Sequence, residues 1–284
     1  MTPSEAVVEL DHALSEAGLE DTRIQSEVLV MHLLNMDRAH LYRAWAEEII
    51  TQHSQQSLQN LLKRRLAREP LAYIIGKWEF FGLEFIVDQR VLIPRPETEL
   101  LVEHALEITL PMVQNKDICT IADIGTGSGA IAISLGIYIP NSVIYATDIS
   151  QEALEVAQNN CDSHGLTERI QLLRGDLLNP IVGPVDLIIS NPPYVRDGDL
   201  DLRAPELEHE PEIAFKGGPQ GLDLVMRLLT QSITKLAPGG SLLIEVSPSQ
   251  ARVAQAHAAE LFPRSQVDLI CDLAGWNRAL HIKT

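Results

Sequence analysis

The chain has 284 residues and a mass of 31.4 kDa, a length that suits one large α/β domain together with a smaller one. Apolar residues make up 45% and charged residues 21%, which excludes a mainly disordered chain, and no apolar run approaches the roughly 20 residues of a membrane-spanning helix. The formal net charge of −17 gives no overall attraction for a polyanion, although it leaves room for a local basic groove.

The cysteines and the N-terminus bear on where the protein works. Cys119, Cys161 and Cys271 are scattered, in no C-x-x-C spacing, so we expect no disulfide framework and no metal site, and we expect each thiol to be a small core side chain. The first residues, Met1–Glu5, lack an apolar targeting segment. We therefore predict a cytoplasmic protein with no membrane association.

Residues 1–75 have the apolar spacing of short amphipathic helices. Leu10 and Leu14 lie on one helical face, and similar stripes recur twice before residue 70. The third stripe ends in a basic cluster, Lys63-Arg64-Arg65 with Arg68. We interpret this cluster as a solvated helix face or a protein contact, with a polyanion site as the less favoured alternative. A small helical domain is predicted here.

Residues 76–96 are predicted to form a β-hairpin linker. The aromatic and β-branched run from Trp78 to Val87 surrounds a glycine turn, and Pro94-Arg95-Pro96 then requires an extended segment. A helix opens at Glu97, and the remaining residues, 97–284, are assigned to a second domain.

Strands and helices alternate from about residue 117 onward, which predicts an α/β fold with a mostly parallel sheet covered on both faces. The last two strands have no helix between them, so we expect an antiparallel edge. The predicted strands are Ile118–Ile124, Val143–Thr147, Ile170–Leu173, Val185–Ser190, Ser241–Val246, Gln266–Cys271 and Arg278–Ile282, and the predicted helices are 129–138, 150–163, 221–236 and 248–260.

A glycine-rich loop follows the first of these strands and opens a helix. Its sequence is Asp123-Ile124-Gly125-Thr126-Gly127-Ser128-Gly129, and glycines let a backbone turn tightly and approach a ligand closely. The loop has no lysine, unlike a phosphate-binding loop, and its G-x-G-x-G spacing departs from the dinucleotide pattern. A purely structural turn remains an alternative, and Asp123 either organises the loop or lies near a cationic part of a ligand.

Two more carboxylates follow the next two strands. Asp148 lies about 25 residues after Asp123, where a carboxylate accepts hydrogen bonds from ribose hydroxyls, or it caps the helix that starts near Ser150. Asp176, beside Leu177, can accept a hydrogen bond from an adenine amino group, or it is a turn aspartate. Together with the glycine loop, these positions resemble the nucleoside pocket of the class I S-adenosylmethionine-dependent methyltransferases.

The tetrapeptide Asn191-Pro192-Pro193-Tyr194 comes directly after a buried strand, where α/β folds bind ligands. The prolines stiffen the loop, and Tyr194 can cover a flat group. Two acceptors, the Asn191 side-chain oxygen and the Pro192 carbonyl, can take both N–H bonds of a planar amine or amide and aim its lone pair at a methyl donor. The rate would then come from orientation and from stabilisation of developing positive charge, without a strong general base. A structural Asn-Pro turn is the alternative.

The tetrapeptide is similar to that of the amino-methyltransferases, and further segments narrow the resemblance. The segments that resemble signatures of the protein-(glutamine-N5) methyltransferases are Phe80–Phe85, Leu92–Glu99, Glu210-Pro211, Gly217-Gly218, Gly221–Asp223 and Asp272–Arg278. Because the resemblance covers the whole chain, including the helical N-terminal part, it points to the HemK/PrmC branch, which methylates peptide chain release factors.

This resemblance implies a class I methyltransferase fold, Rossmann-like with a seven-stranded, mostly parallel sheet, and S-adenosyl-L-methionine as cofactor. It implies that Gly125, Thr126, Gly127, Ser128, Gly129, Asp148, Asp176, Leu177 and Asn191 bind the cofactor. It further implies that Asn191, Pro192, Pro193 and Tyr194 bind a glutamine in the Gly-Gly-Gln loop of class I release factors, with Asn191, Pro192 and Tyr194 catalytic. The helical domain would recognise the body of that protein. We expect a monomer with no direct contact to nucleic acid.

Two segments depart from the family pattern, Ala214-Phe215-Lys216 after the tetrapeptide and Ser247-Pro248 after the fifth predicted strand. They bear on fine specificity and leave the methyl-transfer residues intact. Three alternatives remain open: a ribosomal-protein glutamine-N5 methyltransferase, an adenine-N6 nucleic-acid methyltransferase, and a non-catalytic binding module that kept the fold.

Overall fold

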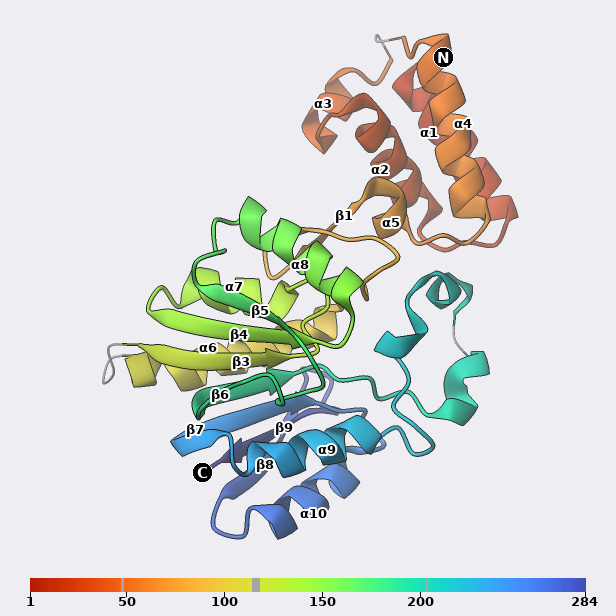
Figure 1. Cartoon of the computed structure of the whole chain (residues 1–284). Coiled ribbons are helices and arrows are strands. Elements are labelled where there is room, and N and C mark those ends of the chain that lie inside the picture. The colour runs from red at the N-terminus through yellow and green to blue at the C-terminus, as the bar shows by residue number, and fades with distance from the viewer. Residues whose placement is uncertain (47–48, 114–117, 203) are drawn as a thin grey trace. The chain divides into compact units, whose positions relative to one another are not determined.

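The computed structural model describes residues 1–46, 49–113, 118–202 and 204–284, and the chain divides into two compact units (Figure 1). One unit consists of Met1–Gly76 with Ala204–His209, and the other of Lys77–Arg203 with Glu210–Thr284. Among the described residues, no helix has both the length and the apolar character needed to cross a membrane.

The N-terminal unit is helical, as predicted. A capping box starts its first helix, because the Thr2 hydroxyl accepts from the Glu5 N–H while the Glu5 carboxylate accepts from the Thr2 N–H. Leu10, Leu14 and Leu29 are fully buried in its apolar core. Two short helices of this unit were not predicted, because they are too short to show an apolar stripe. The helices are α1 (Pro3–Glu16), α2 (Thr22–Leu34), α3 (Arg38–Arg43), α4 (Gln52–Leu66) and α5 (Leu71–Ile75).

The basic cluster at the end of α4 is engaged by acidic partners within this unit. Arg65 is buried and lies 3.1 Å from the Glu206 carboxylate, and Arg68 lies 3.4 Å from the same carboxylate. Arg64 forms two hydrogen bonds with Glu69. The short segment of residues 204–209 is thereby fastened to α4, and the burial of Arg65 contradicts the interpretation of the whole cluster as a solvated helix face.

The predicted hairpin is present as β1 (Lys77–Phe80) and β2 (Leu83–Ile86), which pair antiparallel. Phe81 and Gly82 form its turn with φ of 51° and 71°, the left-handed values that a two-residue hairpin turn needs. Buried Asn160 pairs with the backbone of Ile86 through both its side-chain oxygen and its amide nitrogen. The hairpin is therefore held to the second unit.

A seven-stranded sheet forms the centre of the second unit, in the order β5-β4-β3-β6-β7-β9-β8, which confirms the predicted fold class. The strands from β5 to β7 pair in parallel, and β9 is antiparallel to both β7 and β8, as expected for the last two strands. The strands are β3 (Cys119–Ile124), β4 (Ser142–Asp148), β5 (Ile170–Arg174), β6 (Val185–Ser190), β7 (Leu236–Glu245), β8 (Gln266–Cys271) and β9 (Asn277–Lys283).

Helices cover both faces of this sheet (Figure 1), which is why every residue of β6 is buried. Apolar residues of α9 and α10 share one core cluster with Ile188, Leu242 and Leu280 from neighbouring strands. The helical elements are η1 (Pro96–Thr98), α6 (Glu99–Val113), α7 (Ala130–Tyr138), α8 (Gln151–Ser163), η2 (Asp197–Leu202), η3 (Pro205–His209), η4 (Glu212–Ala214), α9 (Asp223–Ser232) and α10 (Ala251–Leu261).

Three predictions about this unit were wrong in detail. The helix predicted over 221–236 ends at Ser232, and β7 begins at Leu236, before the predicted start at Ser241. The early part of β7 contains Gly240, where an added Cβ would lie 3.0 Å from the Asp186 carbonyl, so this glycine permits close strand packing. Cys271 is exposed rather than buried, because it ends the edge strand β8.

Candidate functional site

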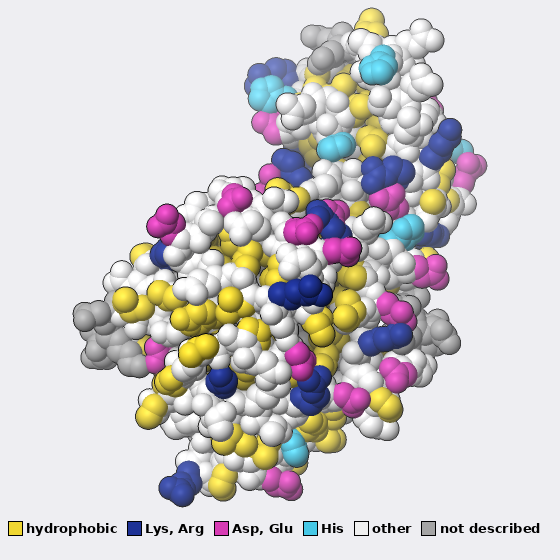
Figure 2. Space-filling model, viewed as in Figure 1, with side chains coloured by type: hydrophobic (Ala, Val, Ile, Leu, Met, Phe, Trp, Pro, Cys, Tyr) yellow, Lys and Arg dark blue, Asp and Glu magenta, His cyan; other side chains and the backbone are white. Residues whose placement is uncertain are grey.

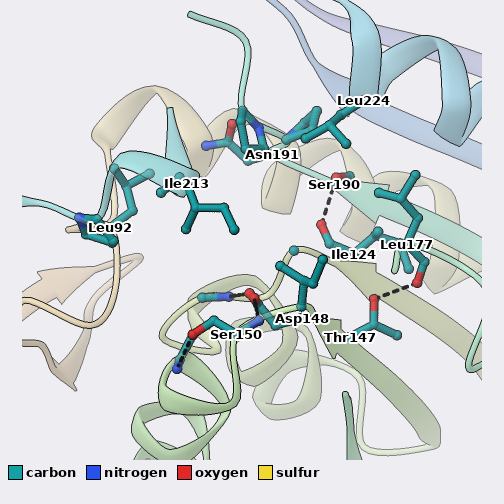
Figure 3. A pocket seen from close by; sticks show the side chains of 18 of the residues that line it. Leu92, Ile124, Thr147, Asp148, Ser150, Leu177, Ser190, Asn191, Ile213 and Leu224 are labelled. Atoms are coloured by element: carbon teal, nitrogen blue, oxygen red, sulfur yellow. Dashed lines mark hydrogen bonds between the residues drawn. The ribbon is translucent and has the colours of Figure 1, made fainter. Parts of the chain in front are cut away.

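A pocket opens where β3, β4, β5 and β6 end, at the carboxyl edge of the parallel strands (Figure 3). It encloses about 970 Å³ of space, part of it open to solvent. Figure 2 shows apolar side chains gathered around a hollow on the viewed face of the second unit. The residues that line it include Gly125, Gly127, Asp148, Asp176, Leu177, Asn191, Pro192, Pro193, Ile213 and Arg227.

The glycine loop has an open backbone toward the pocket. Gly125 and Gly127 have φ of 73° and 56°, and a Cβ added to either would meet no atom within 4 Å. At Gly129 an added Cβ would lie 3.1 Å from Ile133, so this glycine serves close packing of α7. The first two glycines therefore leave space in which a ligand can approach the backbone.

Asp123 holds the glycine loop in place through hydrogen bonds. Its Oδ2 accepts from the Thr126 hydroxyl at 2.6 Å and from the Ala132 N–H at 3.1 Å. The side chain is fully buried, and burial raises the pKa of the Asp123 carboxyl to about 7. Of the two roles left open by the sequence, organising the loop is the one that these contacts support.

Asp148 connects the glycine loop with the start of α8. Its Oδ2 accepts from the Gly127 N–H and its Oδ1 from the Ser150 N–H, both at 2.9 Å. The cap of α8 is Ser150, whose hydroxyl accepts from the Ala153 N–H, so capping does not account for Asp148. Burial raises the pKa of the Asp148 carboxyl, although three backbone N–H groups oppose the shift. The carboxylate lines the pocket with lone pairs still available.

Leu177 and Asp176 close the pocket on the β5 side. Leu177 has φ of 51°, a conformation that bulky residues rarely adopt, and its carbonyl accepts from the Thr147 hydroxyl at 3.0 Å. Asp176 forms an ion pair with Arg227 of α9. Thr147 and Leu177 lie together at one side of the pocket in Figure 3.

Asn191 lies across the pocket from Asp148 and Ser150, next to Leu224 (Figure 3). It follows β6 directly, and the last residue of that strand, Ser190, donates to the Ile124 carbonyl at 2.7 Å. The Asn191 side-chain nitrogen donates to the Thr98 hydroxyl at 2.8 Å. The amide is therefore anchored at its nitrogen end, and its oxygen is left as an acceptor.

Tyr194 lies behind the pocket wall with its hydroxyl 3.2 Å from Oε1 of Glu245. Burial, reinforced by the neighbouring Glu245 carboxylate, raises the pKa of the Tyr194 hydroxyl far above its usual range. Two glycines lie close against the backbone of Tyr194. A Cβ at Gly217 would lie 2.8 Å from the Tyr194 Cα, and one at Gly221 would lie 2.3 Å from the Tyr194 carbonyl. This crowding gives a physical reason for the glycines in the segment after the tetrapeptide.

The two departures from the family pattern lie at different places. Ala214 lines the pocket and Phe215 is buried, its carbonyl accepting from the Val195 N–H. Lys216 pairs with Glu212. Ser247-Pro248 forms the turn between β7 and α10, away from the pocket lining.

The structure brings most of the predicted site residues to one cavity. Eight of them line it, namely Gly125, Gly127, Asp148, Asp176, Leu177, Asn191, Pro192 and Pro193. Four are not among its lining residues: Thr126, Ser128, Gly129 and Tyr194. Among the described residues, no group of three or more His, Cys, Asp or Glu side chains is placed to hold a metal ion.

Several lining residues were missed by sequence reasoning. Arg90 and Leu92 reach the pocket from the segment after the hairpin, Ile213 from the loop after the tetrapeptide, and Arg227 from α9. Thr98 and Glu245, which contact the tetrapeptide, were also missed. Leu92 and Thr98 lie in the segment Leu92–Glu99, which the sequence showed only as a family resemblance and without a role for either side chain. The spacing of the motifs gives no signal for the other positions.

Two family models match separate parts of the chain. Residues 5–76 match the PrmC N-terminal domain, and residues 98–206 match the methyltransferase small domain. A release factor glutamine methyltransferase from Moorella thermoacetica is 38% identical over 98% of this chain and 97% of its own length. One from Rhodopirellula baltica is 35% identical over 94% and 90%. The chain belongs to the release factor glutamine methyltransferase family.

Solved structures of other methyltransferases share the fold. A ribosomal protein L11 methylase from Lactobacillus delbrueckii subsp. bulgaricus is 24% identical, covers 72% of this chain and 88% of its own, and has a TM-score of 0.50. A 16S rRNA N2 G1207 methyltransferase from T. Thermophilus, in complex with AdoMet and guanosine, is 16% identical over 73% and 49%, with a TM-score of 0.51. At these identities the likeness concerns the fold alone.

Proposed function

We propose that this protein transfers a methyl group from S-adenosyl-L-methionine to the side-chain amide nitrogen of the glutamine in the Gly-Gly-Gln loop of class I peptide chain release factors. The observation that carries the proposal is the position of Asn191. Asn191 extends its side-chain amide from the end of β6 at the rim of the pocket, and the glycine loop and Asp148 lie on the other side of that pocket. Membership of the release factor glutamine methyltransferase family supports the substrate.

The pocket fits S-adenosyl-L-methionine by shape and by donor set. The open space beside Gly125 and Gly127 admits a ligand against the backbone, and the Asp148 carboxylate can accept from ribose hydroxyls. Leu177 and Ile149 provide apolar surface for a flat base, with Asp176 beside them as an acceptor. When bound, the cofactor supplies an electrophilic methyl group on a sulfonium.

Asn191 and Pro192 would hold the glutamine. A neutral amide nitrogen is a poor nucleophile because its lone pair is delocalised, so the residues that receive it must orient it and stabilise the charge that develops on it. The Asn191 side-chain oxygen and the Pro192 carbonyl would accept its two N–H bonds. This arrangement leaves the lone pair pointing into the pocket, and the surplus proton can leave after transfer. Pro193 and Tyr194 would shape the same wall.

The remaining parts of the proposal concern the partner and the setting. The helical domain, residues 1–75, would recognise the body of the release factor, the hairpin over 76–96 would link it to the catalytic domain, and residues 97–284 would perform the transfer. The protein partner is supported by membership of the release factor glutamine methyltransferase family, and the pairing of Arg64, Arg65 and Arg68 with internal carboxylates leaves less of this basic cluster available to a nucleic acid. We propose a cytoplasmic monomer.

A methyl-transfer assay with labelled S-adenosyl-L-methionine tests the function. The acceptors are a purified class I release factor, the same factor with alanine for the glutamine of its Gly-Gly-Gln loop, a ribosomal protein mixture, and bulk DNA. We expect label on the intact factor alone. Label on ribosomal proteins with none on the factor would establish the ribosomal-protein reaction instead. Label on DNA would establish the adenine reaction, and cofactor binding without transfer to any acceptor would indicate a binding module.

The Asn191→Ala variant tests the orientation mechanism. We expect turnover to fall by at least 100-fold while the dissociation constant for S-adenosyl-L-methionine stays within about threefold, because the loss of alignment and charge stabilisation acts on the transfer step. Single-turnover rates and calorimetric titration give the two quantities. A near-normal rate would refute the mechanism.

A further inference from the structure

A chain of buried hydrogen bonds runs behind the tetrapeptide and ends at a carboxylate that the reaction as described does not use. Glu245 is the last residue of β7 and is 2% exposed. Its Oε2 lies 2.7 Å from the Thr98 hydroxyl, and its Oε1 lies 3.2 Å from the Tyr194 hydroxyl. Thr98 is itself buried and is the group that accepts from the Asn191 side-chain nitrogen.

The donors and acceptors that these groups carry determine which group donates and which accepts in each hydrogen bond. An ionised carboxylate can only accept hydrogen bonds, so Glu245 engages the single hydroxyl proton of Thr98. The Thr98 oxygen then has only lone pairs to offer Asn191, and it can pair with the amide nitrogen but not with the amide oxygen. The Asn191 amide is therefore turned with its nitrogen toward Thr98 and its oxygen away from it.

We propose that Glu245 is a positioning residue that acts through Thr98 to aim the Asn191 side-chain oxygen at the reacting amide. The inference rests on the proposed function, since it concerns how that same site holds its substrate. Without the carboxylate, Thr98 can donate to the Asn191 side-chain oxygen, and the Asn191 side-chain amide can flip, which exchanges the positions of its oxygen and nitrogen. The flipped amide would present its N–H donors to the N–H donors of the substrate.

The surroundings of Glu245 bear on its charge. Tyr194 and Thr98 donate to it, Arg278 of β9 favours the ionised form, and Glu97 of η1 opposes it. Burial outweighs these favourable contacts and raises the pKa of the Glu245 carboxyl to about 7. A larger fraction of Glu245 is therefore ionised as the pH rises above neutrality, and the ionised carboxylate keeps Thr98 as a hydrogen-bond donor to Glu245 and an acceptor from Asn191.

Four variants of the full chain test the inference: Glu245→Gln, Thr98→Val, Thr98→Ser and the matched control Thr109→Val. Thr109 lies on α6, which follows η1, and is equally buried, but its hydroxyl donates to the Ala105 carbonyl. We expect kcat to fall at least tenfold in Glu245→Gln and Thr98→Val. Thr98→Ser, which keeps the hydroxyl, and the Thr109→Val control should stay within about threefold of wild type. Cofactor affinity should stay within about threefold in all four variants.

Two further readouts separate positioning from a structural effect. The double variant Glu245→Gln/Thr98→Val should lose no more activity than either single variant, because both break the same chain. The ratio of the wild-type kcat to the Glu245→Gln kcat should rise with pH through about 7. Fully additive losses, or wild-type kcat in Thr98→Val, would overturn the inference.

A spectroscopic measurement keeps the inference testable even if the proposed substrate is wrong. The side-chain NH₂ resonance of Asn191 is assigned by its absence in Asn191→Ala. We expect slow hydrogen exchange at this group in the wild type and in Thr109→Val, and fast exchange in Thr98→Val and Glu245→Gln. Equal exchange in all of these proteins would overturn the positioning role, whereas failed methylation of release factors with the expected exchange pattern would refute the function alone.

Discussion

The open space beside Gly127 makes a prediction that separates stability from cofactor binding. In the Gly127→Ala variant the new Cβ would meet no protein atom within 4 Å, so the only cost to folding is the left-handed backbone at φ of 56°. That conformation costs an alanine roughly 1–2 kcal/mol. The same Cβ would project into the space assigned to S-adenosyl-L-methionine, where it would collide with a ligand lying against the backbone.

Gly165 offers a matched control. Its φ is 67°, an added Cβ would also meet nothing within 4 Å, and it lies between α8 and β5, outside the pocket lining. Gly165→Ala should therefore carry about the same backbone cost without the collision. For a chain of this size, we expect both variants to melt lower by roughly 2–8 °C, from about 2–4 °C per kcal/mol.

Calorimetric titration with S-adenosyl-L-methionine provides the decisive comparison. We expect Gly127→Ala to bind at least tenfold more weakly than Gly165→Ala, which corresponds to about 1.4 kcal/mol or more. Equal affinity in two variants with equal melting temperatures would refute the reasoning, because it would mean that the ligand does not lie over Gly127.

Three other predictions address the charged groups of the two units. In Asp148→Ala the loss of acceptors should weaken S-adenosyl-L-methionine binding by roughly 1–3 kcal/mol in a titration, and unchanged affinity would exclude Asp148 from the ribose site. In Asp123→Asn the change should appear in the pH dependence of unfolding. The folded-state pKa of about 7 exceeds the ordinary value of 3.8, so wild-type stability should fall between about pH 4 and 7, by roughly 4 kcal/mol, as the folded carboxyl resists ionisation. Denaturant titrations at several pH values should show this slope reduced in the variant, and an unchanged slope would contradict the assignment. In Arg65→Met the segment of residues 204–209 should lose one of the two arginine contacts to Glu206 and be cut faster by a protease. Lys63→Met, an exposed change on the same helix, should leave the cutting rate unaltered. Equal rates in the two variants would show that the Arg65–Glu206 ion pair does not hold the segment.

Local sequence patterns were sufficient to predict the main architecture of the second unit. Alternation of strands and helices predicts a parallel sheet because crossovers between parallel strands usually contain a helix, and the absence of a helix before the last strand predicts the antiparallel pair. The glycine loop, Asp148 and the tetrapeptide were also predictable from the sequence, because each lies at the carboxyl end of a strand. Parallel strands bring their carboxyl ends to one edge of the sheet, so residues far apart in sequence are predicted to share a site.

The tertiary structure alone decided how these residues are supported. Spacing in the sequence could not assign the capping of α8 to Ser150, since Asp148 and Ser150 are both capping residue types. It could not place β9 between β7 and β8, because strand order depends on pairing across the sheet. Nor could it bring Thr98 and Glu245 together behind Asn191, since their contacts span 93 and 147 positions of the chain and exist only once the sheet has formed. Motifs report local geometry, and a hydrogen-bond chain between distant elements leaves no periodic signal.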